Sequence, residues 1–518
     1  MSCCQEKDLT ITDATYWSQP QEVTSGDPNG VHQTTSTDYD FNTSLANTYT
    51  NAAGLVTSLS YDATMTPASI TLPTGAGSQR ATDYDNLSSS STLTYEDGGV
   101  TKTLMSTTSH DGWGRVIQTV DLNNAQVNTG YDAMGRVTSR TNPFTAGGPP
   151  GPSTTTQYDI ANRAVIMTLP DGNTVRTDYS GSRVTATDQA GRKMKRDTDG
   201  LGRLVKVTEQ DVTGALIQET SYAYNLLDKL TLVNQGGQQR RYKYDALGRL
   251  LFERIPEQTA TINDGTGTYW STKYTYTQFN AVLTKQDASG AIITYGYDAL
   301  HRVNSISYDT ANASGVASTP SVSLSYDTGG GLSSVTVGNQ FTETYNYDSY
   351  HRAQSVTRWV LGQVNDSRKT YTTSYEYNQA SQLTKISYPS GFHVDPSYDD
   401  RGRMAEFLYD KDNAWQGGYI TNLAYNPAGQ VSGLSLGNGV AETYTYDLLG
   451  RLVTSNQTSN GVSAQRRFDY DRWGNRTGVW NATSGGTRIQ STTLEQSGGV
   501  PTNRITSLAN SGITSNYI

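Results

Sequence analysis

The sequence has few of the residues that catalytic, metal-binding or disulfide-stabilised proteins depend on. Its 518 residues include 2 Cys, which are the adjacent Cys3 and Cys4, and 5 scattered His. Two neighbouring cysteines supply neither a disulfide framework nor the four ligands of a structural zinc site. The histidines show no triad or metal-ligand spacing, and no glycine-rich phosphate loop joins a strand to a helix. We therefore predict a protein that is not an enzyme, with no catalytic residues, no metal and no cofactor.

Apolar and basic residues are also scarce. Hydrophobic residues make up 34 % of the chain, below the roughly 45–50 % of globular proteins, a range that also counts glycine. No stretch approaches the roughly 20 apolar residues of a membrane span, and MSCCQEKDLT lacks the segments of a signal peptide. The net charge of −9 argues against nucleic acid, which requires a basic surface. We expect neither a nucleic-acid partner nor a membrane span.

Tyrosine and glycine are abundant instead, with 35 Tyr against 8 Phe, and 50 Gly. Many of these residues lie in a recurring segment, which reads YDAMGRV at 131–137, YDALGRL at 244–250, YDALHRV at 297–303 and YDLLGRL at 446–452. A catalytic site needs its residues once. A repeat on this scale therefore indicates architecture.

Each copy of this segment has the properties of a tight turn. Three residues after the aspartate stands glycine, or else Asn162, Asn280, His301 or His351, and these residue types tolerate a positive φ. Aspartate first and a left-handed residue fourth are typical of a type I turn closed by a G1 bulge. The repeat turn residues include Tyr131, Asp132, Gly135, Arg136, Tyr244, Asp245, Gly248, Arg249, Tyr297, Asp298, Arg302, Tyr446, Asp447, Gly450 and Arg451.

An arginine follows the left-handed residue in nine of the turns, always four residues after the aspartate. Across a tight turn this spacing brings a carboxylate and a guanidinium close enough to pair. Nine copies of one catalytic pair would serve no purpose. We interpret the pair as a charge-assisted clamp on a hairpin, worth about 1 kcal/mol or less per exposed copy.

Tyrosines also alternate along the strand that enters the turn, as Tyr242 and Tyr244 do. Period two places both side chains on one face of a strand. Short intervals of about 21 residues alternate with longer ones, and a second turn signal such as DASG at 287–290 lies midway in the short interval. The sequence therefore predicts an all-β chain, a long antiparallel meander of hairpins without substantial helix. The tyrosine–aspartate turns should lie on one edge of this ribbon and the mid-repeat turns on the other.

The longer intervals carry their extra residues mid-repeat, so we expect loops to project from that edge on every second hairpin. These stretches are 141–153, 255–270, 308–320, 359–370 and 408–419. Trp270, Trp359 and Trp415 lie in them and are the candidate ligand contacts, although a loop tryptophan more often caps the adjacent sheet. Because strands twist and long open edges invite aggregation, we expect the ribbon to coil against itself and enclose space. Tyrosine suits such a single-layer wall because its ring packs while its hydroxyl stays in water.

The YDxxGRL repeats resemble those of the Rhs/YD-repeat family, found in bacterial Rhs polymorphic toxins, the cocoon of insecticidal Tc toxins, wall-associated proteins and teneurins. The resemblance is clear from about residue 110 and looser before it. It implies a spiral β-sheet shell, which in the toxins encloses a C-terminal toxin. Other members of the family are linked to cell-surface contact and carbohydrate binding.

Two departures from the toxin pattern bear on function. The Pro-x-x-x-x-Asp-Pro-x-Gly motif of toxin-type members appears only as a fragment at 27–30, with Glu22 in place of its proline. No segment resembling a toxin domain follows the repeats, which stop at TSNYI where the pattern calls for Tyr-Asp. We expect the chain to be a fragment of a larger protein. We divide it into a degenerate repeat segment at 1–109, a regular YD-repeat sheet at 110–476 and a truncated repeat at 477–518.

Two functions of different classes remain open. In the first, the chain is a structural shell segment that encloses or displays a polypeptide cargo such as a toxin. In the second, it is an extracellular adhesion or carbohydrate-binding module whose loops contact a cell-surface glycan or protein. We favour the shell, because the repeats predict a wall whether or not the loops bind. Either function implies a secreted or cell-surface protein.

Overall fold

The computed structural model describes residues 7–10, 21–26, 32–83, 86–313, 315–361, 368–411, 414–471, 473–481, 486–497, 500–510 and 513–516. Regular structure within these ranges consists of strands, and no helix occurs among them. The strands fall into two successive coils of one ribbon. We call β1–β29 the first coil and β30–β46 the second coil.

The first coil comprises β1 (Lys7–Thr10), β2 (Glu22–Gly26), β3 (His32–Tyr39), β4 (Ala46–Thr50), β5 (Val56–Tyr61), β6 (Pro67–Thr71), β7 (Gly77–Asp83), β8 (Ser88–Asp97), β9 (Val100–His110), β10 (Val116–Val120), β11 (Ala125–Tyr131), β12 (Val137–Thr141), β13 (Phe144–Thr145), β14 (Ser153–Tyr158), β15 (Ala164–Thr168), β16 (Thr174–Ser180), β17 (Arg183–Thr187), β18 (Lys193–Thr198), β19 (Leu204–Gln210), β20 (Leu216–Tyr224), β21 (Leu230–Gln235), β22 (Gln238–Tyr244), β23 (Leu250–Arg254), β24 (Ile262–Asn263), β25 (Tyr269–Trp270), β26 (Thr272–Tyr276), β27 (Val282–Asp287), β28 (Ile292–Tyr297) and β29 (Val303–Asp309).

The second coil comprises β30 (Val322–Tyr326), β31 (Leu332–Val337), β32 (Phe341–Tyr347), β33 (Ala353–Leu361), β34 (Arg368–Tyr377), β35 (Leu383–Ser387), β36 (Phe392–Tyr398), β37 (Met404–Lys411), β38 (Ala414–Tyr425), β39 (Val431–Leu436), β40 (Ala441–Tyr446), β41 (Leu452–Ser459), β42 (Val462–Tyr470), β43 (Arg476–Trp480), β44 (Arg488–Ser497), β45 (Val500–Asn510) and β46 (Ile513–Asn516).

Of the strands in the described part of the chain, 44 form one sheet. Successive strands pair antiparallel, as β21 does with β22 and β22 with β23. The simple order is interrupted where β12 pairs with β14 and β23 with β26, and β24 and β25 form a small separate hairpin. The predicted all-β meander of hairpins is confirmed.

The tyrosine–aspartate turns lie along one edge of this sheet, which we call the YD edge, and the turns between them lie along the opposite mid-repeat edge. In the turn at 132–136 the Gly135 N–H donates to the Asp132 carbonyl, and the Asp132 N–H donates to the Arg136 carbonyl, each over 3.0 Å. Gly135 has a φ of 82°, and the strand register shifts at Tyr131. The replacements Asn162, Asn280, His301 and His351 also have positive φ, between 59° and 67°. The predicted G1-bulge turn is confirmed.

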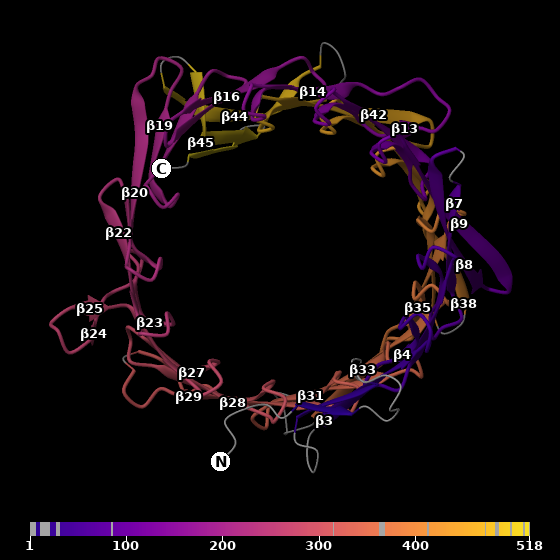
Figure 1. The fold of residues 1–518 in the computed structure, drawn as a ribbon, viewed down its shortest axis with the longest axis horizontal. Helices are drawn as coiled ribbons and strands as arrows, with labels where there is room; N and C mark the ends of the chain where they lie inside the picture. Colours follow the sequence, from indigo (N-terminus) through magenta and orange to yellow (C-terminus); the bar gives the residue numbers. More distant parts are fainter. Residues whose placement is uncertain are drawn as a thin grey trace.

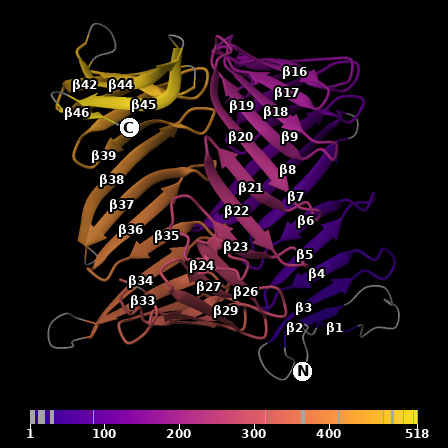
Figure 2. The ribbon, with the colours of Figure 1, turned by 90° about the vertical axis from the view of Figure 1, so that its left-hand side faces the viewer.

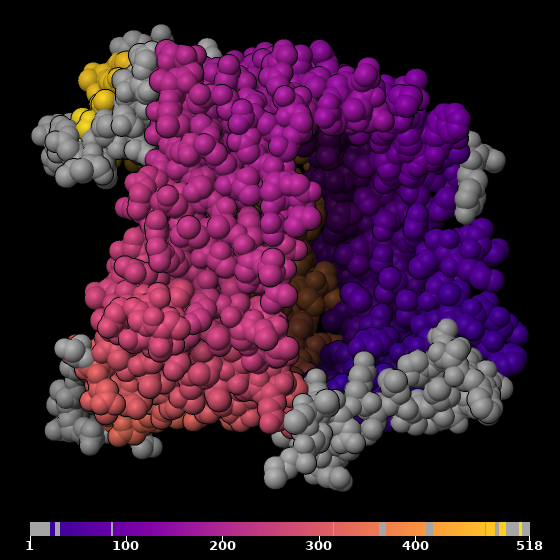
Figure 3. All heavy atoms as spheres, turned by 60° about the vertical axis from the view of Figure 1, so that its left-hand side comes forward, coloured from indigo at the N-terminus to yellow at the C-terminus, as the bar shows by residue number. Residues whose placement is uncertain are grey.

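The sheet curls into a ring and then continues beside itself (Figure 1). Seen from the side, the second coil, coloured orange to yellow, lies next to the first coil along the axis of the ring (Figure 2). The space-filling view shows that the wall surrounds a hollow interior (Figure 3). The expected spiral β-sheet is therefore present. Both long edges of the ribbon consist of turns. Coiling therefore covers these turns, and the expectation that it would cover unpaired strand edges is wrong.

The wall is one sheet thick, so few side chains are deeply buried. In the described ranges the nearly buried apolar side chains are Ala76, Tyr95, Leu104, Ala125, Phe144, Trp270 and Val479. This thin packing agrees with the low apolar content. It leaves hydrogen bonds and aromatic contacts between neighbouring repeats to hold much of the sheet.

The expectation about long loops is correct for 255–270 and wrong for 359–370 and 408–419. The segment between β23 and β26 projects outward and carries β24 and β25 (Figure 1). In 359–370 and 408–419, by contrast, the extra residues lengthen hairpins, because β33 pairs with β34 out to Leu361–Arg368 and β37 pairs with β38 out to Lys411–Ala414. Trp359 and Trp415 thus lie in paired strands, where regular hydrogen bonding satisfies the backbone.

Candidate functional site: the repeat clamps and the seam between coils

The aspartate of each repeat turn binds both the turn and its arginine. Asp132 Oδ1 accepts hydrogen bonds from the backbone N–H groups of Met134 (2.9 Å) and Arg136 (3.0 Å), while Oδ2 accepts one from Arg136 Nε (2.7 Å). The same ion pair forms in all nine predicted copies: Asp111–Arg115, Asp132–Arg136, Asp159–Arg163, Asp199–Arg203, Asp245–Arg249, Asp298–Arg302, Asp348–Arg352, Asp399–Arg403 and Asp447–Arg451. The predicted clamp is confirmed.

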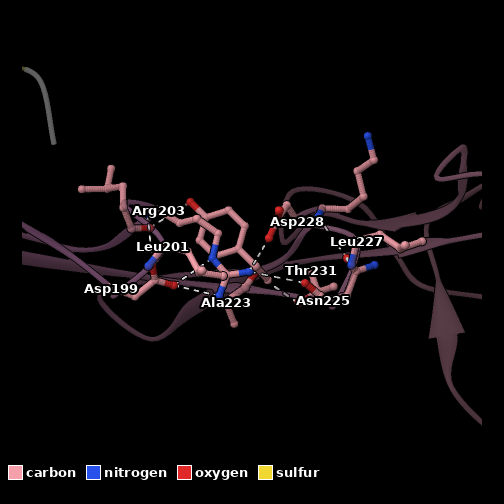
Figure 4. A network of polar contacts seen from close by, with 11 residues as sticks. Asp199, Leu201, Arg203, Ala223, Asn225, Leu227, Asp228 and Thr231 are labelled. Atoms are coloured by element: carbon pink, nitrogen blue, oxygen red, sulfur yellow. Dashed lines mark hydrogen bonds and ion pairs between the residues drawn. The ribbon is translucent and has the colours of Figure 1, made fainter.

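The arginine also reaches the next repeat, which the spacing did not indicate. Arg136 Cζ lies 4.7 Å from the ring centroid of Tyr158, and the Tyr158 hydroxyl donates to the Val137 carbonyl over 2.7 Å. Arg203, which pairs with Asp199, also reaches the following turn, where its Nη1 lies 2.6 Å from Asp228 Oδ1 (Figure 4). The repeat motif therefore links successive repeats as well as closing its own hairpin.

The clamp formed by Asp348 and Arg352 is partly buried and illustrates the electrostatics. Burial raises the pKa of the Asp348 carboxyl, but hydrogen bonds from the backbone and side chain of Arg352 outweigh it and hold that pKa below its ordinary value. Arg352 also donates to the Asn378 carbonyl (2.8 Å) and stacks on Tyr377 at 4.7 Å. Because the folded-state pKa is lowered, this clamp stabilises the fold above the ordinary aspartate pKa. Its contribution is lost as the pH falls through the lowered value.

Two turns use an uncharged version of the clamp that our reading of the sequence missed. Asn378 Oδ1 accepts from the Gln382 N–H (3.0 Å), and Gln382 Nε2 donates to the Gly402 carbonyl of the next turn (2.8 Å). Asn426 and Gln430 repeat this arrangement. The signal was present in the sequence, since an asparagine and a glutamine stand where the aspartate and arginine stand elsewhere.

Converting the Asp348–Arg352 clamp to Asn–Gln should leave the fold nearly as stable, because the neighbouring turn shows that the neutral pair makes equivalent bonds. We expect the Asp348→Asn, Arg352→Gln double variant to change the free energy of unfolding by less than about 1 kcal/mol. The single variant Asp348→Ala should lose about 1–2 kcal/mol, because the turn N–H groups lose their acceptor. Chemical denaturation at neutral pH measures both. A double variant as unstable as the single one would refute the equivalence.

The seam between coils is formed by the YD edge of the second coil resting on the mid-repeat edge of the first coil. Most of its contacts come from the second or third position of the turns. Gln379 Oε1 accepts from the Glu96 N–H (2.9 Å), and Arg401 Nη1 donates to the Asn123 carbonyl (2.8 Å). Further contacts join Gln33 with Gly330, Lys102 with Tyr398, Asn142 with Leu448 and Asp188 with Trp473.

A small apolar cluster lies at this seam. Ala76, Tyr95 and Leu104 of the first coil pack together, and Ala380 of the second coil packs against them. Leu104 also lies against the backbone of Gly402, where an added Cβ would come within 3.1 Å of its Cδ1. The cluster thus joins segments about 300 residues apart in the sequence.

The three candidate tryptophans do not form one binding surface. Trp270 is 6 % exposed and packs on Phe252 with 5.7 Å between ring centroids. It therefore caps the adjacent sheet, which was the alternative to ligand contact. Trp359 borders a depression of about 400 Å³ on the mid-repeat edge. The side chain of Trp415 is outside the described residues. Ligand contact through these residues stays a prediction.

The histidines in the left-handed turn position have structural roles. The His301 ring stacks on Phe279 at 3.9 Å, and His351 stacks on Tyr347 at 4.7 Å while contacting Asp327. No group of three His, Cys, Asp or Glu side chains suited to a metal ion occurs in the described part of the chain.

Comparisons with known proteins support this description. Residues 262–411 match the family model described as teneurin YD-shell. The chain is similar to the crystal structure of TcdB2-TccC3, with 14 % identity over 95 % of this chain and a TM-score of 0.73. It is also similar to the Photorhabdus luminescens Tc holotoxin pore bearing a TccC3 mutation, with 13 % identity over 96 % and a TM-score of 0.78. The chain spans 31 % and 32 % of the length of those chains, and no curated protein matches it.

Proposed function

We propose that this chain, which has the shell fold of the Rhs/YD-repeat family and matches its teneurin YD-shell model over residues 262–411, forms part of the wall of a container for a polypeptide cargo. The observation that carries the proposal is the hollow interior surrounded by one continuous sheet (Figures 1 and 3). The wall would act by exclusion, keeping its contents away from proteases and from other proteins.

Two structural features support a barrier role. The clamps tie each repeat to the next, so that the sheet resists opening between hairpins, and the seam holds the second coil against the first. No side-chain chemistry is needed for such a barrier. The proposal therefore includes that the protein is not an enzyme.

The same proposal places the chain in a secreted or cell-surface protein. One of the structures to which it is similar is named as part of a Tc holotoxin, which supports a toxin or similar polypeptide as the cargo class. In the described ranges, no helix is long and apolar enough to cross a membrane. Adhesion to glycans stays an alternative prediction, which the burial of Trp270 does not favour.

Protease protection of a fused polypeptide tests the container proposal. A short unstructured reporter joined after Ile518 should be digested several-fold more slowly than the same reporter joined to an unrelated soluble domain, because the wall screens it from protease. The readout is the half-life of the reporter band at a fixed protease concentration.

The control is the same fusion carrying Leu104→Ala, which weakens the seam while leaving the reporter unchanged. Protection should fall in this variant. Equal digestion of the reporter on the shell and on the unrelated domain would overturn the proposal.

A further inference from the structure

The YD edge of the first coil carries a row of exposed apolar side chains. They occupy the second or third position of six turns, and each is at least 70 % exposed: Trp113, Met134, Ile160, Leu201, Leu226 and Leu247. The row is interrupted at the turn between β16 and β17, which carries Gly181 and Ser182. Turns on one edge are two strands apart, so neighbouring members of the row lie about 10 Å apart, and about 20 Å apart across the turn between β16 and β17. Rows of exposed apolar groups of this kind mark interaction surfaces.

Residues at the equivalent positions of the second coil make most of the contacts with the first coil at the seam. Gln379, Arg401 and Trp473 all stand at these positions, and all three bind the mid-repeat edge. Several of these residues are more polar than those in the exposed row. Leu448 and Trp473, however, are apolar at these positions and also contact the first coil, so an apolar residue at this turn position is compatible with a covered edge.

Trp113 and Trp473 make the comparison specific, because they hold the same place in the turns DGWG (111–114) and DRWG (471–474). Trp473 is seated on a mid-repeat turn. Its indole N–H donates to Asp188 Oδ2 over 2.9 Å, and the Arg192 guanidinium lies 4.6 Å from its ring centroid. Trp113 is 86 % exposed. In this fold, a tryptophan at this turn position can therefore bind the mid-repeat edge of another coil, as Trp473 does.

The second coil presents such an edge on its far side. A depression of about 400 Å³ there is lined by Gly338, Asn339, Thr342 and Trp359. Tyr388 and Phe392, at the turn between β35 and β36, are also exposed on this edge. Both open edges are built of turns two strands apart, so the turns of one edge can lie opposite the turns of the other with the same spacing.

We propose that a second copy of this chain docks head to tail on the first, with the YD edge of its first coil on the mid-repeat edge of the second coil of its neighbour. The contact continues the seam already present within one molecule. It is heterologous, because the two surfaces differ, so association extends along the ring axis and does not stop at a closed dimer. The net charge of −9 on each copy opposes association, so added salt should strengthen it by screening.

Sedimentation velocity of the full chain over a concentration series tests this proposal. We expect the sedimentation coefficient to rise with concentration and with salt. The YD-edge variant Trp113→Asp, Leu201→Asp should stay monomeric. So should the mid-repeat-edge variant Trp359→Ala, Phe392→Asp. Met167→Asp serves as the control, because Met167 is 41 % exposed on a strand and not on either edge, and it should associate like the parent chain.

Mixing the two edge variants distinguishes a head-to-tail contact from other association. Each variant retains one intact edge, so an equimolar mixture should form a dimer and no larger species, although neither variant dimerises alone. Circular dichroism of each variant confirms that the sheet is intact. A parent chain that stays monomeric at its highest soluble concentration overturns the proposal, as does a parent chain whose association survives both edge variants.

Discussion

Replacing Leu104 with alanine is expected to lower the free energy of unfolding by about 2–5 kcal/mol, the usual range for a buried leucine. Leu104 is 6 % exposed and belongs to the cluster that joins the first coil to the second through Ala380. Removing its side chain leaves a cavity that the rigid turn at Gly402 fills poorly. Since a thin wall has few other buried contacts, the loss should also open the seam. Chemical denaturation measures the first effect and limited proteolysis between the coils measures the second.

The adjacent Met105 provides a matched control on the same strand. It is 54 % exposed, so Met105→Ala should change stability by less than about 0.5 kcal/mol. If both variants lose the same stability, the strand β9 is sensitive as a whole and the seam cluster has no special role. If Leu104→Ala is destabilised without faster cleavage at the seam, polar contacts alone hold the coils together.

Raising the pH above 10 is expected to unfold the sheet cooperatively. The hydroxyls of Tyr274, Tyr345 and Tyr444 have their pKa raised to about 12, Tyr274 and Tyr444 first by burial and Tyr345 first by its hydrogen bond to Glu343. Burial also raises the pKa of many repeat tyrosines, including Tyr244, Tyr297, Tyr347, Tyr377, Tyr425, Tyr446 and Tyr470.

The direction of this pH effect follows from the linkage between proton binding and folding. A raised folded-state pKa means that the unfolded chain loses its tyrosine protons first, so stability is complete below the ordinary value of 10.0 and is lost as the pH rises through the folded-state values. The effects of many tyrosines add. Tyrosinate absorption and strand circular dichroism, followed together against pH, should change in one coincident transition. Gradual formation of tyrosinate near the ordinary pKa with the sheet intact would contradict this expectation.

These predictions share a physical basis in the repeat architecture. Each repeat contacts its neighbours through the clamp, so stability along the ribbon is a sum of similar nearest-neighbour terms. The seam adds contacts between segments far apart in the sequence. Damage to one clamp should therefore be local, whereas damage to the seam affects whether the two coils stay together.

Local structure could be predicted from the sequence because each repeat carries the same turn signals independently of the others. Gly135, Asn162 and His301 differ chemically but share a tolerance for positive φ, and the structure places all three there. The pairing of Asp132 with Arg136 followed from their spacing across that turn. The two neutral clamps followed the same spacing, and were missed only because asparagine and glutamine had not been considered as a pair.

Loop positions were harder to read because turn signals mark only where a strand can end. The stretch at 359–370 has extra residues, and the sequence did not reveal that Trp359 would pair with Thr370 and lengthen the hairpin. Trp270 was singled out as a candidate contact, but it packs on Phe252, and that contact depends on how the segment carrying β24 and β25 folds back. Such outcomes depend on neighbours that the local sequence does not specify.

The sequence by itself determined the hairpins, their turns, the two edges of the ribbon and the family resemblance, since all of these rest on residues within one or two repeats. Only the tertiary structure decided which turns meet at the seam. Gln379 contacts Glu96, and Trp473 contacts Asp188, because the twist that accumulates over a whole coil brings those turns opposite one another. A small change in twist per strand would shift every such partner. The sequence of any one repeat does not encode this accumulated twist. The row of exposed side chains that includes Trp113 could therefore be recognised only in the coiled structure.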